Sequence, residues 1–126
     1  MTRRPLLGLA LTLFLAACTP TEIEEVTSES WAGDVGTTNM MMMMTIAHRG
    51  TTVSGSGGFT ALLVPGSKQS YTISGMRRAD TLDLLLKRPG EEVHFVGRYS
   101  DSSRRGLTGT LAGGDYYGAT VVLRRQ

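Results

Sequence analysis

Apolar residues recur at every second position from Thr37 onward, between short turn sequences rich in Gly, Pro, Asp and Arg. No segment keeps a 3.6-residue hydrophobic period for three turns, so the pattern predicts β-strands. The expected strands are 37–47, 51–57, 59–64, 69–76, 81–87, 92–99, 106–112 and 117–124. Their connections suit hairpin loops and leave no room for crossover helices, so successive strands should be antiparallel neighbours.

The two faces of these strands differ in character. One face collects apolar side chains, such as Leu84 and Phe95, while the alternate positions are mostly polar and should face water. Glycines share the apolar face at four positions, which are Gly55, Gly75, Gly97 and Gly109. Such glycines indicate a sharply coiled sheet or close backbones. We therefore expect an all-β fold, a small antiparallel up-and-down eight-stranded β-barrel, with a two-sheet β-sandwich of the same strands as the alternative.

The first 17 residues have the organisation of a secretory signal peptide. A short basic head with Arg3 and Arg4 precedes an apolar run, and the small pair Ala16–Ala17 follows. Together with Cys18, residues 15–18 (LAAC) resemble the lipobox of bacterial lipoproteins. The resemblance implies cleavage before Cys18, diacylation of its thiol and acylation of the new amino group, for example by palmitate. The implied location is the cell envelope, lipid-anchored on the outer side of the cytoplasmic membrane or in the outer membrane.

Charge divides the remaining chain. Residues 19–30 hold four Glu, no Lys or Arg and no usable periodicity, which is typical of a flexible tether. The expected organisation is a signal peptide over 1–17, a lipidated Cys and flexible acidic tether over 18–30, and a barrel domain over 31–126. The formal net charge is +2, and loss of Arg3 and Arg4 brings the 13 basic residues level with the 11 acidic ones. This balance argues against a nucleic-acid partner.

Two segments resemble the start of the avidin family of eight-stranded barrels. Residues 31–37 (WAGDVGT) and 53–57 (VSGSG) match its W-x-N-x-x-G-S and L-T-G-T-Y patterns at Trp31, Gly36 and Gly55. Lipocalins, which are related calycin barrels, also place a Trp at the barrel mouth. The resemblance implies a ligand mouth for a small apolar molecule. The residues expected to line this mouth are Trp31, Asp34, Thr37 and Tyr71. Gly33 and Gly57 replace the Asn and Tyr that grip the biotin ureido group, which argues against biotin.

Five consecutive methionines, 40–44, lie on one predicted strand. Strand alternation places Met41 and Met43 on the face opposite Met40, Met42 and Met44. One interpretation is adaptable core filling, with the outer pair packed under a loop. Another is that Met41 and Met43 form an apolar contact face for a partner protein or lipid. Soft-metal binding with His48 is a third, but one face offers only three thioethers, and we expect no metal and no cofactor.

The sequence contains no recognised catalytic pattern. It lacks a G-x-S-x-G elbow, an H-E-x-x-H pair and a phosphate-binding loop, and the only cysteine is assigned to the lipid. His48 falls in a predicted turn and His94 on a predicted outer position, so both should be exposed without partners. We therefore expect a protein that is not an enzyme.

Arginine pairs follow three of the predicted strands. These pairs are Arg77–Arg78, Arg104–Arg105 and Arg124–Arg125. The three strands run in the same direction, so the pairs should gather at one end as a rim for phosphate or carboxylate groups; three separate solvated turns are the alternative. The function expected is a membrane-tethered envelope lipoprotein that binds or interacts without catalysis. The alternative is a structural or accessory lipoprotein with a filled barrel and no small-molecule ligand, so a cavity of several hundred Å³ would distinguish the two.

Overall fold

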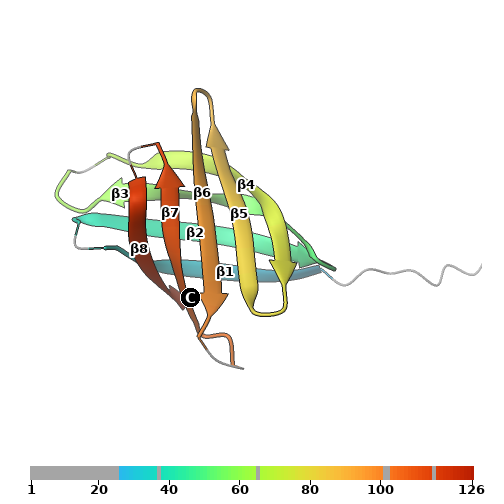
Figure 1. Ribbon diagram of the computed structural model, residues 1–126. Helices are drawn as coiled ribbons and strands as arrows, with labels where there is room; N and C mark the ends of the chain where they lie inside the picture. Colours follow the sequence, from blue (N-terminus) through green and yellow to red (C-terminus); the bar gives the residue numbers. More distant parts are fainter. Residues whose placement is uncertain (1–25, 37, 65, 101–102, 115) are drawn as a thin grey trace, which may run out of the picture.

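The computed structural model describes residues 26–36, 38–64, 66–100, 103–114 and 116–126. Eight strands follow one another along the chain (Figure 1). They are β1 (Val26–Val35), β2 (Met40–Arg49), β3 (Thr52–Ala61), β4 (Gln69–Arg78), β5 (Thr81–Arg88), β6 (Glu91–Tyr99), β7 (Gly106–Gly113) and β8 (Tyr116–Arg125). Each strand pairs antiparallel with the next, and β8 pairs with β1, which closes the sheet. The up-and-down barrel is confirmed, and the sandwich alternative is excluded.

Short turns connect the strands. Gly50 and Gly90 adopt φ values of 61° and 80° in the β2–β3 and β5–β6 turns, a left-handed conformation that favours glycine. The β7–β8 hairpin is less regular, since its register shifts between Leu111 and Ala112. None of the described segments forms a helix long and apolar enough to cross a membrane.

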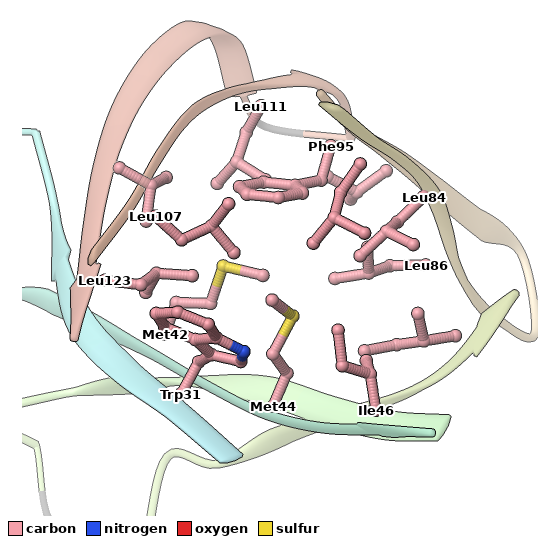
Figure 2. Close-up of a cluster of buried hydrophobic side chains, with 14 of the residues drawn as sticks. Trp31, Met42, Met44, Ile46, Leu84, Leu86, Phe95, Leu107, Leu111 and Leu123 are labelled. Carbon is pink, nitrogen blue, oxygen red and sulfur yellow. The ribbon is translucent and has the colours of Figure 1, made fainter. Parts of the chain in front are cut away.

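The barrel interior is filled by hydrophobic side chains from all eight strands. Figure 2 shows part of this core, with Trp31, Met42 and Phe95 among the labelled residues. Among the described residues, nineteen hydrophobic side chains are buried, including Trp31 of β1, Met42 and Met44 of β2, and Phe95 of β6. The predicted inward positions Leu84 and Phe95 are both fully buried, and His94 between the β6 core residues is exposed. The period-two pattern therefore gave the correct face for these strands.

The inward glycines lie where neighbouring groups come close. A Cβ atom on Gly55 would lie 2.0 Å from the carbonyl oxygen of Thr45, and one on Gly75 would lie 2.0 Å from that of Asp83. At Gly97 and Gly109 the aromatic ring of Phe95 occupies the space that a side chain would need, since both Cβ positions lie less than 3 Å from its atoms. The glycines thus allow close backbones on two strands and a large aromatic ring between the other two.

The structure corrects two strand predictions. One correction adds a strand and the other removes one, so the expected total of eight is unchanged. Residues 26–30, expected in the tether, are the first half of β1, so the barrel begins before Trp31. Residues 51–57 and 59–64, expected as two strands, correspond to the single strand β3, which continues through Gly58 and ends at Ala61, so that residues 62–64 lie outside it. Gly58 fits there because a Cβ atom would lie 2.0 Å from the carbonyl oxygen of Gln69 on β4. The glycine therefore marks a close approach of two strands and not a turn.

The methionine run forms the first half of β2. Met42 and Met44 are buried, and Met40 packs against the core from a partly buried position. Met41 is half-buried and Met43 is 51% exposed, so the outer pair faces away from the interior. The alternation expected for this strand is observed, and the inner methionines act as core residues.

Candidate functional site: an arginine-rich end over a buried carboxylate

The end of the barrel where β1 begins is rich in arginine. At this end β2, β4, β6 and β8 terminate, and β3, β5 and β7 begin. Eight arginines lie in its turns or within the last two residues of these strands. They are Arg49, Arg77, Arg78, Arg98, Arg104, Arg105, Arg124 and Arg125. We call this the arginine-rich end; it contains all six arginines of the predicted rim.

The opposite end of the barrel has balanced charge among the residues that the structure describes. Its cations are Lys68, Lys87 and Arg88, and its carboxylates are Asp34, Glu91 and Glu92. Two of the cations are paired there, Arg88 with Glu91 at 2.9 Å and Lys87 with Glu92 at 3.4 Å. At the arginine-rich end the structure describes only two acidic residues. Asp80 lies in the β4–β5 turn, and Glu29 lies inside the barrel on β1. The charge of the barrel is therefore strongly asymmetric along its axis.

A buried carboxylate lies inside the arginine-rich end. Glu29 on β1 is only 4% exposed. Its Oε1 atom accepts hydrogen bonds from the Tyr99 hydroxyl at 2.8 Å, from His48 Nε2 at 2.8 Å and from Trp31 Nε1 at 3.3 Å. The rings of Trp31 and Tyr99 also pack at 5.8 Å between centroids. We call these four residues the Glu29 cluster; it joins strands β1, β2 and β6.

The pKa values in this cluster follow from its geometry. Burial alone would raise the pKa of Glu29, but the hydrogen bonds from His48 and Tyr99, with a smaller one from Trp31, outweigh it and lower that pKa. Burial, together with the neighbouring Glu29 carboxylate, raises the pKa of Tyr99 above its usual range. Glu29 is therefore a charged acceptor and Tyr99 a neutral donor at neutral pH. The proton of this His48–Glu29 contact is then placed on Nε2 of His48.

Arginines surround the outer side of the cluster. A hollow of about 280 Å³ is lined by Thr27, Glu29, His48, Gly50, Arg77 and Arg104. Arg104 adopts a φ of 53°, which is uncommon for a residue with a side chain, and its guanidinium lies 5.2 Å from the centre of the Tyr99 ring. Nη1 of Arg125 lies 3.7 Å from Oε2 of Glu29. Arginines from three separate segments thus lie around the cluster: Arg77 and Arg104 line the hollow, and Arg125 contacts the Glu29 carboxylate.

The geometry limits what chemistry His48 performs. Its Nε2 atom is engaged by Glu29, and its Nδ1 atom is buried without a hydrogen-bond partner among the described residues. A general base must reach the proton that it abstracts, and neither ring nitrogen is open to a molecule in the hollow. The Glu29 cluster is therefore suited to holding strands β1, β2 and β6 together and to placing Tyr99 beneath Arg104.

The structure corrects the expectation for both histidines. His48 lies on the inner face near the end of β2, and it is 6% exposed and bonded to Glu29, so it is neither in a turn nor without a partner. His94 is exposed as expected, but its Nε2 atom contacts Asp83 Oδ1 at 2.5 Å across β5 and β6. Sequence reasoning missed both contacts because each histidine lies far from its carboxylate partner in the chain, at separations of 19 residues for His48 and 11 residues for His94.

The residues expected at a ligand mouth are not brought together. Trp31 is buried beside Tyr99, whereas the Tyr71 hydroxyl donates to Glu91 Oε2 at 2.6 Å at the opposite end. Asp34 is exposed on the outer face of β1, and Thr37 lies outside the described residues, as does Cys18. A single mouth formed by Trp31, Asp34 and Tyr71 is therefore wrong.

The outer methionines border shallow hollows on the outside of the sheet. Met43 lines one of about 410 Å³ together with Thr45 and Lys68, and Met41 lines another of about 660 Å³ with Asp34 and Arg124. Both hollows mix apolar and polar side chains. Within the described ranges no group of three or more His, Cys, Asp or Glu side chains is placed to hold a metal ion.

The barrel was also compared with known proteins. No protein-family model, curated protein or solved structure matches this chain.

Proposed function

We propose that this chain is a lipid-anchored protein of the cell envelope whose barrel is a non-enzymatic interaction module. The anchor is Cys18, the only cysteine, placed directly after Leu15, Ala16 and Ala17. The contact surface is the arginine-rich end, which meets phosphate or carboxylate groups of an envelope component. The observation that carries the proposal is the gathering of eight arginines around one end of a barrel with a filled interior.

By the distinction drawn from the sequence, the filled interior favours the alternative of a barrel without a small-molecule ligand, so any contact is made through the surface. A small-molecule site inside an eight-stranded barrel needs a cavity of roughly 300–1,000 Å³. The space at the centre is instead taken by large side chains, including Trp31, Phe59 and Phe95. The proposal therefore assigns binding to the outside of the barrel and not to its centre.

Guanidinium groups are well suited to anionic groups. Arginine binds phosphate and carboxylate through paired N–H donors, so several arginines on one surface favour a partner with repeated negative charge. Arg78 and Arg105 are exposed in or beside turns, which leaves them open to such a partner. Arg104 is fixed by its stacking on Tyr99, and this order lowers the entropic cost of a contact.

The non-enzymatic part of the proposal rests on the same end of the barrel. Among the described residues the one buried acid–base pair is Glu29 with His48; their hydrogen bond joins His48 Nε2 to Glu29 Oε1, and His48 Nδ1 is buried. No serine or cysteine nucleophile is among the residues that line the adjoining hollow. The pair therefore fits a structural role.

Replacing Cys18 by serine should release the protein from membranes. Without the thiol no diacylglycerol can be attached, so the covalent lipid anchor that we propose is lost. Cell fractionation should find the wild-type chain with the membranes and the Cys18→Ser variant outside them or retained as an uncleaved precursor. Labelled palmitate should enter the wild-type chain only. A Cys18→Ser variant that is still labelled and fully processed would reject the anchor.

Loss of two rim arginines should weaken binding to an immobilised phosphate matrix. One double variant combines Arg78→Gln and Arg105→Gln. The control double variant combines Lys68→Gln and Lys87→Gln, which removes the same charge from the opposite end. The first variant should elute at clearly lower salt than the second, because contact through one end depends on charge at that end. Equal shifts for both variants would favour the second candidate function, an accessory lipoprotein without a defined anionic partner.

A further inference from the structure

We infer that the arginine-rich end docks on anionic lipid headgroups of the membrane that holds the chain's own lipid. The inference rests on the proposed anchor at Cys18 and names the partner of the proposed contact surface. It follows from where the chain enters the barrel, from the length of chain before that point and from the distribution of charge.

The chain enters the barrel at the arginine-rich end. Val26, the first residue of β1, pairs with Arg49 at the end of β2. Arg78, the last residue of β4, and the segment around Arg104, which follows β6, lie at the same end. Any anchor before β1 therefore pulls this end, and not the opposite one, toward the membrane.

The length of the connection keeps this end near the lipid surface. Val26 lies eight residues after Cys18, which allows at most about 29 Å between them when the chain is fully extended. A lipid anchor holds the barrel at high effective concentration beside the bilayer, so weak electrostatic attraction is enough to orient it. The attraction acts within a Debye length, about 8 Å at physiological ionic strength, so docking requires close approach of the arginines.

Charge favours the same orientation. Eight arginines face the anchor side, against Asp80 and the buried Glu29, which already accepts three hydrogen bonds. The opposite end has three cations and three carboxylates among its described residues. Anionic phospholipids attract each nearby Lys or Arg, so turning the arginine-rich end toward them gains the most.

The carboxylates before β1 are the main competitor for these arginines. Residues 19–25 contain Glu22, Glu24 and Glu25, which also lie between the anchor and the barrel. These three carboxylates are fewer than the eight arginines at this end, so the competition is partial. If the competition is real, replacing all three by glutamine should strengthen docking and not abolish it.

The experiment uses the full lipidated chain with one added thiol. Because Cys18 is acylated, Thr51→Cys in the β2–β3 turn supplies a unique labelling site at the arginine-rich end, and Lys68→Cys supplies one at the opposite end. Each protein receives a fluorescent label and is reconstituted into vesicles of phosphatidylcholine alone or of phosphatidylcholine with phosphatidylglycerol. Both vesicle types contain a small amount of headgroup spin-labelled lipid, which quenches nearby fluorophores.

The label at position 51 should be quenched several-fold more strongly in the anionic vesicles than in the neutral ones. The excess should disappear in 1 M salt, where the Debye length is about 3 Å. Arg78→Gln with Arg105→Gln should lower the ratio of docked to undocked protein by about tenfold or more. Lys68→Gln with Lys87→Gln should leave the position 51 signal unchanged.

Three results would overturn the inference. They are equal quenching at position 51 in both vesicle types, stronger quenching at position 68 than at position 51, and insensitivity to the arginine substitutions. Flotation of the vesicles and the mass of the Cys18 peptide distinguish these from failure of the proposed function. An unacylated chain that does not float rejects the anchor, whereas a floating, acylated chain without excess quenching rejects only the docking. Retention on the phosphate matrix with no lipid effect would then indicate an acidic partner other than the membrane.

Discussion

Phe95→Ala should lower the free energy of unfolding by about 3–5 kcal/mol, as measured by urea denaturation. Phe95 is fully buried, and its cross-strand neighbours are Leu84 and Leu111. Its ring lies against Gly97 and Gly109, which have no side chains to fill the space that alanine leaves. The loss should therefore fall in the upper part of the range for core substitutions.

Two further variants make this expectation specific. Val96→Ala changes the adjacent outward residue, which is 40% exposed, and should cost no more than about 0.5 kcal/mol. Gly97→Ala should destabilise the wild type, because its Cβ atom would lie 2.6 Å from the Phe95 ring, but it should stabilise the Phe95→Ala variant. Equal losses at Phe95 and Val96, or additive effects of Gly97→Ala, would contradict the observed register and packing.

Glu29→Gln should cost about 2–4 kcal/mol at pH 7, because three hydrogen bonds would lose their charged acceptor in a buried site. The pKa of Glu29 is lowered in the folded state, so its ionised form adds stability above the ordinary carboxyl pKa of 4.5. This contribution is lost as the pH falls through the lowered folded pKa. The difference in unfolding free energy between the wild type and Glu29→Gln should therefore have its full size at pH 7 and become smaller in acid.

The matched control for Glu29→Gln is Glu92→Gln. Glu92 is an exposed carboxylate whose pairing with Lys87 at 3.4 Å is open to solvent. Its loss should change the unfolding free energy by less than about 1 kcal/mol. If the difference in unfolding free energy between the wild type and Glu29→Gln stays constant down to strongly acidic pH, the charge of Glu29 is not what stabilises the cluster.

The period-two pattern predicted the second half of the barrel well. Strands β4 to β8 begin and end within two residues of the expected limits, because each alternates apolar and polar residues between clear turn sequences. The same alternation placed Leu84 and Phe95 inside and His94 outside. Where one face of a strand is uniformly apolar, local sequence is enough to define it.

Strand β1 was missed because its inner face is not apolar. The inward positions of β1 include Glu29 and Gly33 as well as Trp31 and Val35, and an acidic residue at its start is typical of a solvated segment. Glu29 is tolerated inside only because His48 and Tyr99 donate to it, and these residues lie 19 and 70 positions away in the chain. No local pattern reveals partners at that separation, so the buried cluster and the start of the barrel were hidden together.

The arginine pairs were placed by topology and not by local sequence. Because β4, β6 and β8 run in the same direction, the pairs at or just after their carboxyl ends meet at one end once the barrel is closed. The additional arginines there, Arg49 and Arg98, extend this end beyond the three pairs. The expected ligand mouth failed for the opposite reason, since Trp31 and Tyr71 pack toward different ends of the barrel.

Mass spectrometry of the amino-terminal peptide of the mature protein tests the proposed envelope anchor most directly. We predict that the mature chain begins at Cys18 and has a diacylglycerol on the thiol and an acyl chain on the amino group. The Cys18→Ser chain should have neither modification. A mature chain that begins elsewhere, or that has an unmodified Cys18, would contradict the account.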